Sequence, residues 1–450
     1  MQRLKPPIRR VLDRVSCRVA DSPRFDYWRV LEQTQYLPEA RLRDIQFRRL
    51  KKLLAFVYAH NPFHRARFVE AGLTPDDVKA PSDIRKLPIL TKEEVRQNVS
   101  QMISDGYDSK RLLKFKTGGS TGKALEIYLT ETCSELRNAV ARRHNRWSGW
   151  EVGEPVGAIW GNPIYPRSLK AKALSWVRNP CIYLDTMAVT DRSVLEFARQ
   201  WRRARPTLIF GHAHSIFLLA QYLDRLGVND LRPKGIISSS MMLLPHERKE
   251  IEAVFQTRVT DRYGCEEVSL IGCECERHNG MHLNIEHLLV EFLDEKDMDV
   301  PAGRSGRIVV TDLMNYAMPF IRYRIEDMAV PSDRRCVCGR GLPLMEKVSG
   351  RIADFLLKRD GARVAGISLI ENTLTRIPGL DQMQLIQNTM DQLTVHIVPG
   401  KQYNDGRRKE LIDYFKSVFG EQTDIQVVPV DLIAPEPNGK YRFSICKIQS

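Results

Sequence analysis

A short loop rich in glycine and hydroxyl residues constrains this chain more than any other part of it. The loop reads Lys116-Thr117-Gly118-Gly119-Ser120-Thr121-Gly122-Lys123. Glycine lets a backbone approach a ligand closely and turn its N–H groups inward, and the Ser and Thr hydroxyls can donate to phosphate oxygens. The Lys123 ammonium would offset phosphate charge. The loop therefore indicates a polyphosphate site.

This loop differs from the P-loop of nucleoside triphosphatases. The P-loop has four residues between its first glycine and its Gly-Lys pair, and a Ser or Thr follows the lysine to bind Mg²⁺. Here three residues separate Gly118 from Gly122, and Ala124 follows Lys123. The flanking residues 114–116 and 124–129 alternate like strands, so an ordinary hairpin turn is the alternative interpretation.

Length and composition indicate a globular protein of two or three domains. The chain has 450 residues, of which 43% are hydrophobic and 28% are charged. It contains no apolar run of the roughly 18 to 20 residues that span a bilayer, and its start lacks the apolar segment of a signal peptide. We therefore expect a cytoplasmic protein.

The N-terminus is basic. The whole chain has a net charge of +14, and residues 1–52 hold fourteen Lys and Arg against six Asp and Glu. A helical repeat of aliphatic residues lies beside Arg9, Arg10, Arg14 and Arg18; it comprises Ile8, Val11, Leu12, Val15 and Val19. Such a basic amphipathic helix could rest on an anionic membrane, although packing on its own domain is the favoured alternative. Nucleic acid is not an expected partner, because no stacking platform of aromatic residues accompanies the charge.

Cysteine and histidine residues gather in two distant segments. The chain has nine cysteines, an odd number, so a disulfide framework is not expected in a reducing compartment. Cys273, Cys275, His278 and His282 lie close together, and Cys336 and Cys338 follow some sixty residues later. These are zinc-type ligands, but the Cys-x-Cys spacing leaves open which cysteine of each pair would bind. Buried, inert cysteines are the alternative.

Strand and helix patterns alternate through the middle of the chain. Apolar runs at 155–160, 207–211 and 234–238 end in small or turn residues, and helical patterns at 215–226 and 245–255 follow. This alternation predicts parallel strands with crossover helices. Helices are expected before residue 100, notably over 42–59, and β-strands at 288–292 and 306–311. From residue 352 a small α+β domain is predicted, with strands at 355–357, 392–398 and 425–430 and helices at 368–376 and 406–418.

Five motifs in one order resemble the adenylate-forming superfamily. They are the loop at 117–123, Tyr263-Gly264-Cys265-Glu266-Glu267, the segment 318–327, Gly350-Arg351-Ile352-Ala353-Asp354 and Asn438-Gly439-Lys440. From about residue 40 onward the chain looks most like the phenylacetate-CoA ligase branch, which includes CapK-type proteins. The resemblance implies an α/β fold, with a large multi-sheet N-terminal domain and a small mobile α+β C-terminal domain. The boundaries expected are 1–60 for a basic helical segment, 61–351 for the AMP-binding domain and 352–450 for the lid.

The resemblance also implies roles for individual residues. The ATP-binding residues would be Thr117, Gly118, Gly119, Ser120, Thr121, Gly122, Lys123, Ser240, Tyr263, Gly264, Asp327 and Arg351. Glu267 would carry Mg²⁺, a hard cation that favours carboxylate oxygen, and Lys440 and Lys123 would be the catalytic cations. A structural zinc ion would be bound by Cys275, His282, Cys336 and Cys338.

The activity implied is ATP-dependent activation of a carboxylate as an acyl-adenylate. Transfer of the acyl group to CoA, an amine or a sugar hydroxyl would follow, in capsular or exopolysaccharide biosynthesis among other pathways. One alternative is a non-catalytic or divergent protein of the same fold that serves polysaccharide assembly at the membrane face. Glu326 favours this alternative, because relatives have glycine beside the ribose-binding carboxylate. The other alternative is nucleotidyl transfer to an acceptor that is not a carboxylate.

Overall fold

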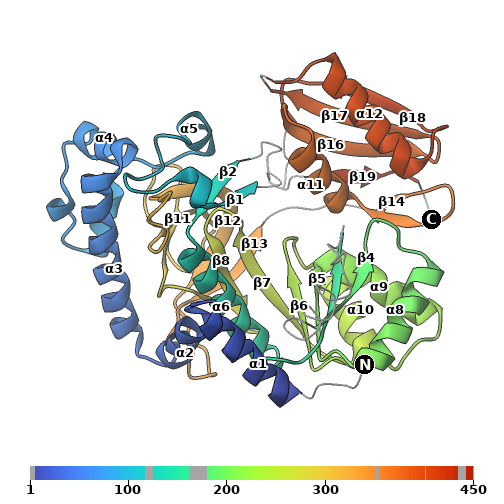
Figure 1. The fold of residues 1–450 in the computed structure, drawn as a ribbon, viewed down its shortest axis with the longest axis horizontal. Helices are drawn as coiled ribbons and strands as arrows, with labels where there is room; N and C mark the ends of the chain where they lie inside the picture. The colour runs from blue at the N-terminus through green and yellow to red at the C-terminus, as the bar shows by residue number, and fades with distance from the viewer. Residues whose placement is uncertain are drawn as a thin grey trace.

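A computed structural model describes residues 6–116, 125–161, 180–349, 355–400, 402–433 and 442–448. The chain forms a large unit followed by a small C-terminal unit (Figure 1). The expected boundary near residue 351 lies outside the described residues. Among the helices that the structure describes, none is long and apolar enough to cross a membrane.

In the part of the chain that the structure describes, five α-helices precede the first strand. They are α1 (Pro6–Val19), α2 (Arg24–Thr34), α3 (Glu39–His60), α4 (Pro62–Glu70) and α5 (Lys92–Gln97), with short 3₁₀ turns η1 (Pro75–Asp77), η2 (Pro81–Lys86) and η3 (Ser109–Arg111). The helix predicted over 42–59 is confirmed as α3. Its buried face includes Leu50, Leu53, Leu54 and Val57, at the three- and four-residue spacing of an amphipathic helix. These side chains pack in a core with Leu289, Leu313 and Ile321.

Two paired strands flank the glycine-rich loop in the sequence. Strand β1 (Leu113–Lys116) pairs antiparallel with β2 (Glu126–Leu129), and Lys116 lies opposite Glu126. The strands predicted on either side of the loop are therefore confirmed, while residues 117–124 themselves lie outside the described ranges. The side chain of Asn315 donates to the Tyr128 carbonyl at 3.1 Å, which attaches this hairpin to the large unit.

Within the described residues, eleven strands form one sheet. The strands of this sheet that come first in the chain, β3 to β7, are parallel. The strand order of the sheet is β10-β11-β12-β13-β9-β8-β7-β6-β5-β3-β4. The parallel strands are β3 (Val156–Trp160), β4 (Cys181–Asp185), β5 (Leu208–His212), β6 (Gly235–Ser239) and β7 (Val259–Cys265). Helices α8 (Asp191–Ala204), α9 (Ala213–Arg225) and α10 (Pro245–Phe255) connect them and share one apolar core with them. The predicted alternation of strands and helices is confirmed.

The other half of the sheet is antiparallel. It contains β8 (Ser269–Glu274), β9 (Met281–Leu283), β10 (Leu288–Leu293), β11 (Gly306–Asp312), β12 (Tyr323–Ser332) and β13 (Leu344–Ser349). Helix α6 (Glu131–Trp147) lies alongside β8 and packs on α2 (Figure 1). This half confirms the β-rich section that the sequence predicts.

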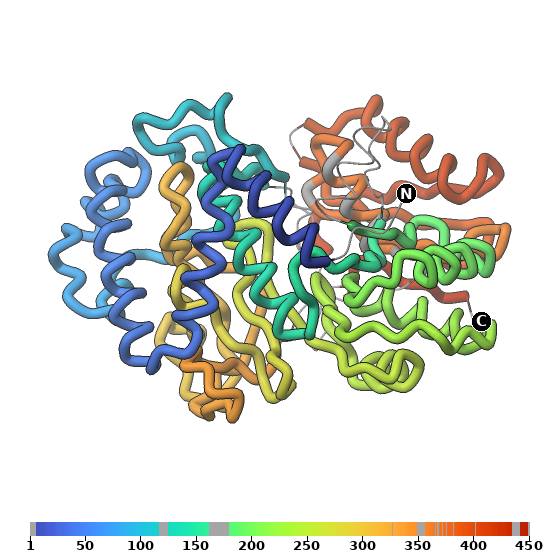
Figure 2. The backbone as a smooth tube through the Cα atoms, turned by 60° about the horizontal axis from the view of Figure 1, so that its bottom comes forward, coloured from blue at the N-terminus to red at the C-terminus, as the bar shows by residue number. Residues whose placement is uncertain are grey.

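Within the described ranges, the C-terminal unit contains a four-stranded sheet, a separate pair of strands and two helices. It comprises β14 (Phe355–Leu357), β15 (Arg363–Ala365), α11 (Gly366–Arg376), β16 (Leu380–Thr389), β17 (Gln392–Pro399), α12 (Asp405–Phe419), β18 (Asp424–Pro429) and β19 (Ser444–Cys446). The sheet order is β18-β17-β16-β19, and β14 pairs with β15 separately. Figure 2 shows this unit, in orange and red, against the green part of the large unit. Val189 and Arg363 exchange two backbone hydrogen bonds there, both of 2.9 Å.

Candidate functional site

Most of the described residues expected at the nucleotide lie at the carboxyl ends of β6 and β7. Ser240 directly follows β6 and is exposed, with a φ of 66°. Tyr263 and Gly264 lie on β7, and Glu267 lies in the turn that joins β7 to β8. Carboxyl ends of parallel strands meet at one edge of a sheet, where α/β proteins bind their ligands. The structure therefore brings these predicted residues to one place.

Gly264 allows the β7–β8 turn to close. A side-chain carbon at this position would come within 2.5 Å of the Ser269 carbonyl oxygen. The β7–β8 ladder also shifts register between Tyr263 and Gly264. Glycine is thus required by the close approach of two backbones.

Asp327 joins this group from a distant part of the chain. It lies on β12, and the Tyr263 hydroxyl donates a hydrogen bond to its carboxylate over 2.8 Å. Both side chains are partly buried. Two residues that the sequence assigns to the nucleotide are therefore in direct contact, although 64 positions separate them.

Glu267 is 6% exposed and has polar neighbours. The Tyr323 hydroxyl donates to its carboxylate over 3.1 Å, and the Lys92 ammonium lies 3.9 Å from the same oxygen. A buried carboxylate requires partners of this kind, because its charge loses the solvation of water. Glu266, the neighbouring acid, is exposed. The two carboxylates of the motif therefore occupy different environments.

Sequence reasoning missed Lys92. The sequence predicts only that helices precede residue 100, and the structure has a helix here, α5, which the Thr91 side chain caps. The segment before α5 is attached to β12, since the backbones of Leu90 and Arg322 hydrogen-bond over 2.8 Å and those of Arg324 and Leu90 over 2.9 Å. This attachment carries Lys92 to Glu267. No spacing in the sequence predicts it.

Sequence reasoning also missed Arg137, which hydrogen-bonds to the backbone of the β7–β8 turn. Its guanidinium, on α6, donates to the carbonyls of Glu266 and Glu267, both over 2.8 Å. It also pairs with the buried carboxylate of Asp312 at 3.2 Å. One planar fork thus holds two successive backbone groups of the turn, a geometry that a lysine cannot reproduce.

Several expected site residues lie outside the described residues. They are Thr117, Gly118, Gly119, Ser120, Thr121, Gly122, Lys123, Arg351 and Lys440. The side chain of Glu326 is likewise not described. Their roles stay predictions.

A partly buried carboxyl, Asp261, lies on β7 two residues before Tyr263. It accepts a hydrogen bond from the Ser238 hydroxyl at 3.3 Å, and its backbone N–H donates to Glu274 at 2.8 Å. Burial, followed by the charge of Glu274, raises the pKa of Asp261 to about 7. Between about pH 4 and pH 7 the folded protein therefore holds a proton here that the unfolded chain has lost.

Asp261→Asn should raise the melting temperature more at pH 8 than at pH 5. Above the raised pKa the native carboxyl is charged and its burial reduces stability, and Asn removes that charge while keeping an acceptor for Ser238. At pH 5 the native carboxyl is already neutral, so the substitution should change little. Thermal melts of both proteins at the two pH values test this, with the exposed Glu421→Gln as control. An Asp261→Asn shift of equal size at both pH values would contradict the prediction.

The expected metal ligands form one cluster, in which His282 of β9 meets cysteines from the segment after β8 and from the loop before β13. Ligand atoms of Cys275, His282, Cys336 and Cys338 all lie within 4.8 Å of one another. The Cys275 and Cys336 sulfurs are 3.6 Å apart, and the Cys338 sulfur lies 3.3 Å from His282 Nε2. A tetrahedral zinc centre with Zn–S bonds of about 2.3 Å separates its sulfurs by about 3.8 Å. The donor set and its spacing fit zinc.

Surrounding groups orient these ligands. His282 Nδ1 lies 3.0 Å from the Leu342 carbonyl, so a proton there would leave Nε2 free to bind a metal. Backbone N–H groups of Arg277 and Arg340 donate to the sulfurs of Cys275 and Cys338. Burial opposes ionisation of Cys338, but His282 and Arg340 outweigh it and lower the pKa of that thiol to about 6.

The structure resolves which candidate ligands belong to the cluster. Cys273 lies on β8 in an apolar core and is not part of it. His278 instead lies 3.4 Å from the Glu274 carboxylate. Cys275 follows the end of β8, where the chain turns toward the loop that holds Cys336 and Cys338.

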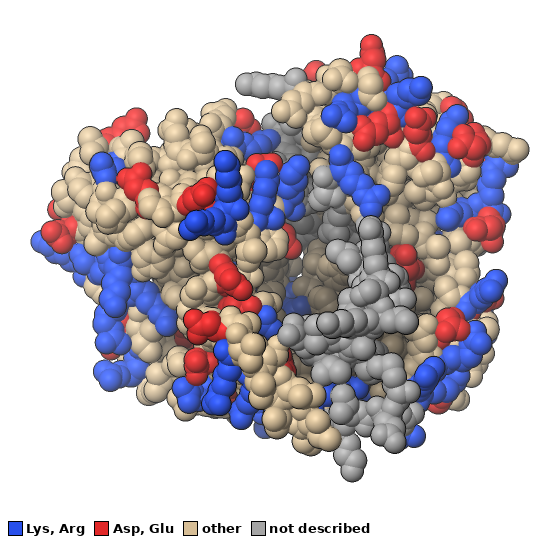
Figure 3. Space-filling model, in the orientation of Figure 1, with Lys and Arg blue, Asp and Glu red and all other residues tan. Residues whose placement is uncertain are grey.

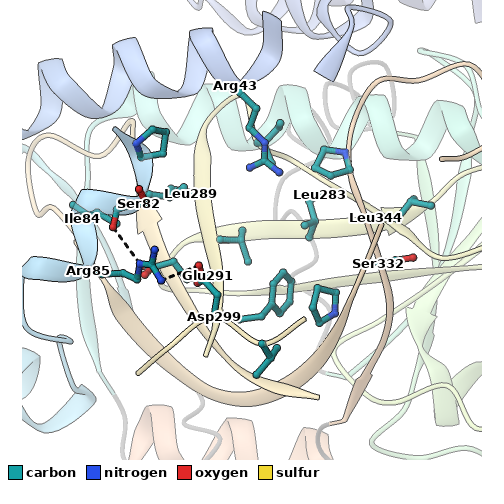
Figure 4. Close-up of a pocket in the computed structure, with 17 residues that line it drawn as sticks. Arg43, Ser82, Ile84, Arg85, Leu283, Leu289, Glu291, Asp299, Ser332 and Leu344 are labelled. Carbon is teal, nitrogen blue, oxygen red and sulfur yellow. Dashed lines mark hydrogen bonds and ion pairs between the residues drawn. The ribbon is translucent and has the colours of Figure 1, made fainter. Parts of the chain in front are cut away.

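A separate pocket of about 300 Å³ lies between α3, η2 and strands β10, β12 and β13 (Figure 4). Its walls are largely apolar, including Leu283 and Leu289. Its two arginines are paired, Arg43 with Glu39 and Arg85 with Asp299, both at 3.1 Å. Among the described residues that line the pocket, both arginines are therefore paired with carboxylates, and the pocket is distinct from the strand-end cluster.

Comparison with known proteins agrees with this architecture. Phenylacetate-coenzyme A ligase of Pseudomonas putida is 26% identical over 405 residues, which cover 86% of this chain and 90% of the relative. Protein CapK of Staphylococcus aureus is 23% identical over 418 residues, covering 91% and 90%. Residues 356–447 match the family described as the CapK C-terminal domain. The solved structure of 2-hydroxyisobutyryl-CoA ligase with 2-HIB-AMP and CoA, in the thioesterification state, superposes with a TM-score of 0.63 at 19% identity, covering 92% of each chain.

The fold is that of the adenylate-forming ligases. In sequence, the chain is similar to phenylacetate-CoA ligases and to CapK along most of its length, and residues 356–447 match the CapK C-terminal domain. The resemblance inferred from the five motifs is confirmed.

Proposed function

We propose that this protein is an ATP-dependent ligase that activates a carboxylate as its acyl-adenylate and passes the acyl group to an acceptor. The observation that carries the proposal is the strand-end cluster of Glu267, Lys92, Tyr263 and Asp327, in a chain whose relatives are phenylacetate-CoA ligases. The small C-terminal unit would act as the lid. The proposal places the reaction in the cytoplasm, where ATP and CoA are available.

The residues of the cluster would bind different parts of ATP. Glu267 would hold Mg²⁺ through carboxylate oxygen, and Asp327, kept in place by the Tyr263 hydroxyl, would bind the ribose hydroxyls with Arg351. Thr117 to Lys123 would surround the terminal phosphates. Ser240 and Gly264 would line the adenine and the carboxylate substrate.

The chemistry requires positive charge. A carboxylate that attacks the α-phosphate brings two negative groups together, so the developing charge and the pyrophosphate leaving group need cations around them. Lys440 and Lys123 would supply two, and Mg²⁺ on Glu267 would supply another. Lys92 would balance the buried Glu267 carboxylate when no metal is present, because the two groups are 3.9 Å apart.

The acyl acceptor would be CoA or another nucleophile. CoA is favoured by the phenylacetate-CoA ligases among the relatives. A sugar hydroxyl or an amine, in capsular polysaccharide synthesis, is the other proposed acceptor; the chain is also similar to CapK, and the similarity includes the C-terminal unit. Both acceptors use the same acyl-adenylate, so the first half-reaction does not depend on this choice.

The cluster of Cys275, His282, Cys336 and Cys338 would hold a structural zinc ion. All four positions would be filled by protein ligands, as in closed structural sites, and none would remain for water or substrate. The site would tie three segments of the large unit together.

Exchange of labelled pyrophosphate into ATP, with and without members of a panel of carboxylic acids, tests the proposal. At least one acid should give exchange that requires both ATP and Mg²⁺. Mass spectrometry with CoA, an amine or a sugar then identifies the product, and AMP that stays on the product would indicate nucleotidyl transfer instead. A folded protein that shows no acid-dependent exchange over a broad panel would contradict the proposal.

A further inference from the structure

Helix α1 exposes its aliphatic face. Five aliphatic side chains along it are 39% to 84% exposed, the largest value belonging to Val19; the five are Ile8, Val11, Leu12, Val15 and Val19. They lie on one side of the helix, at its three- and four-residue spacing. In Figure 3 uncharged atoms cover the region at the lower centre, where α1 lies in Figure 1. A surface helix of a globular protein normally has the opposite orientation.

The charged face of α1 packs inward instead. Arg9, Asp13 and Cys17 are buried at a four-residue interval. Asp13 pairs with Arg142 of α6 at 2.6 Å, and the Arg9 guanidinium donates to the Gly153 carbonyl at 3.4 Å. Gly153 lies so close that a side-chain carbon there would come within 2.6 Å of the Pro6 carbonyl oxygen. Specific polar contacts therefore fix which face of α1 is turned outward.

The charges beside the exposed face are positive. Arg10 is paired with Glu151 at 3.2 Å, whereas within the described ranges no carboxylate lies in ion-pair distance of Arg14 or Arg18. The Arg14 guanidinium lies over the Phe25 ring, 5.5 Å from its centroid. Asp13, the acid of this helix, is buried and neutralised by Arg142. The outer surface of α1 thus combines aliphatic residues with uncompensated arginines.

We propose that α1 binds the surface of an anionic lipid bilayer. Its aliphatic face would enter the boundary between headgroups and acyl chains, while Arg14 and Arg18 would contact lipid phosphates. The pattern of charge selects a lipid surface over a second copy of the chain, because in a symmetric contact of two α1 helices Arg14 and Arg18 would face the same arginines. The inference goes beyond the proposed ligase function and does not depend on it.

Co-sedimentation of the full-length protein with vesicles tests the inference. Binding should occur to phosphatidylcholine vesicles that contain phosphatidylglycerol, should be much weaker to phosphatidylcholine alone, and should weaken as salt rises. The double substitution Val11→Asp and Val15→Asp should reduce the partition coefficient by at least about tenfold, because it places two charges in the apolar face. Arg14→Gln with Arg18→Gln should remove most of the preference for anionic lipid.

A matched control is Val69→Asp, since Val69 is 64% exposed on α4, another helix of the same unit. It should bind vesicles as the native protein does. Circular dichroism and thermal melts verify that each variant is folded. The inference is overturned if the native protein does not bind anionic vesicles, if Val69→Asp reduces binding as much as the α1 variants, or if light scattering shows a dimer that only the α1 variants disrupt and that excludes vesicles.

Discussion

Replacing Glu267 by Gln should lower the rate of acyl-adenylate formation by roughly 10²- to 10³-fold. Gln keeps the size of the side chain and one oxygen that can accept from Tyr323, but it lacks the charge that a hard cation requires. It also leaves the buried Lys92 ammonium without its carboxylate. Acid-dependent pyrophosphate exchange, measured over a range of Mg²⁺ concentrations, tests the prediction. Part of the lost rate should return at high Mg²⁺ if the defect lies in metal binding.

The neighbouring acid supplies the control. Glu266 belongs to the same turn but is exposed, so Glu266→Gln should change the exchange rate by less than about threefold. Thermal melts should show both variants folded. If the exchange rate falls equally in the two variants, the assignment of Glu267 rather than Glu266 as the metal-binding carboxylate is contradicted. Full activity in Glu267→Gln would remove the proposed site altogether.

Loss of the cluster of three cysteines and His282 should destabilise the large unit. The purified protein should contain one zinc ion per chain, and Cys338→Ser should lose it and melt about 5 °C lower or more. The reason is that the cluster joins the end of β8, strand β9 and the loop before β13. Arg340 of that loop also donates to Gln35 at 3.0 Å and lies over the Trp147 ring, so its displacement would disturb helices α2 and α6.

Elemental analysis by mass spectrometry, combined with thermal melts with and without a strong chelator, tests this prediction. Cys446→Ser is the matched control, because Cys446 is a partly exposed thiol on β19, outside the cluster. It should retain the zinc and the native melting temperature. A native protein that contains no zinc, or a Cys338→Ser variant that keeps its zinc, would contradict the assignment.

Local patterns in the sequence predict most of the fold. The helix over 245–255 and the strand over 355–357 have the predicted bounds, and the strands predicted near 207, 234 and 288 shift by one residue at most at either end. These features depend on side-chain periodicity and turn residues, which are properties of neighbouring positions. The order of the motifs likewise indicated the superfamily, since each motif is a short contiguous stretch.

Contacts between segments that are far apart in the chain could not be predicted from the sequence. Lys92 and Arg137 reach the β7–β8 turn because α5 is attached to β12 and α6 packs along β8, and neither placement follows from spacing. The choice between Cys273 and Cys275 was also open, because both fit the same ligand pattern. For α1 the sequence predicted an amphipathic helix, but only its tertiary contacts decide that the aliphatic face is turned outward.

By itself, the sequence predicted most of the secondary structure, the resemblance to the superfamily and the candidate residues of both sites, because each of these is encoded in neighbouring positions. The tertiary structure alone decided which carboxylate is buried beside a cation, which thiols meet and which face of α1 remains exposed. Those outcomes depend on burial and on contacts between segments far apart in the chain, and a free energy of burial belongs to the packed arrangement rather than to any residue in isolation.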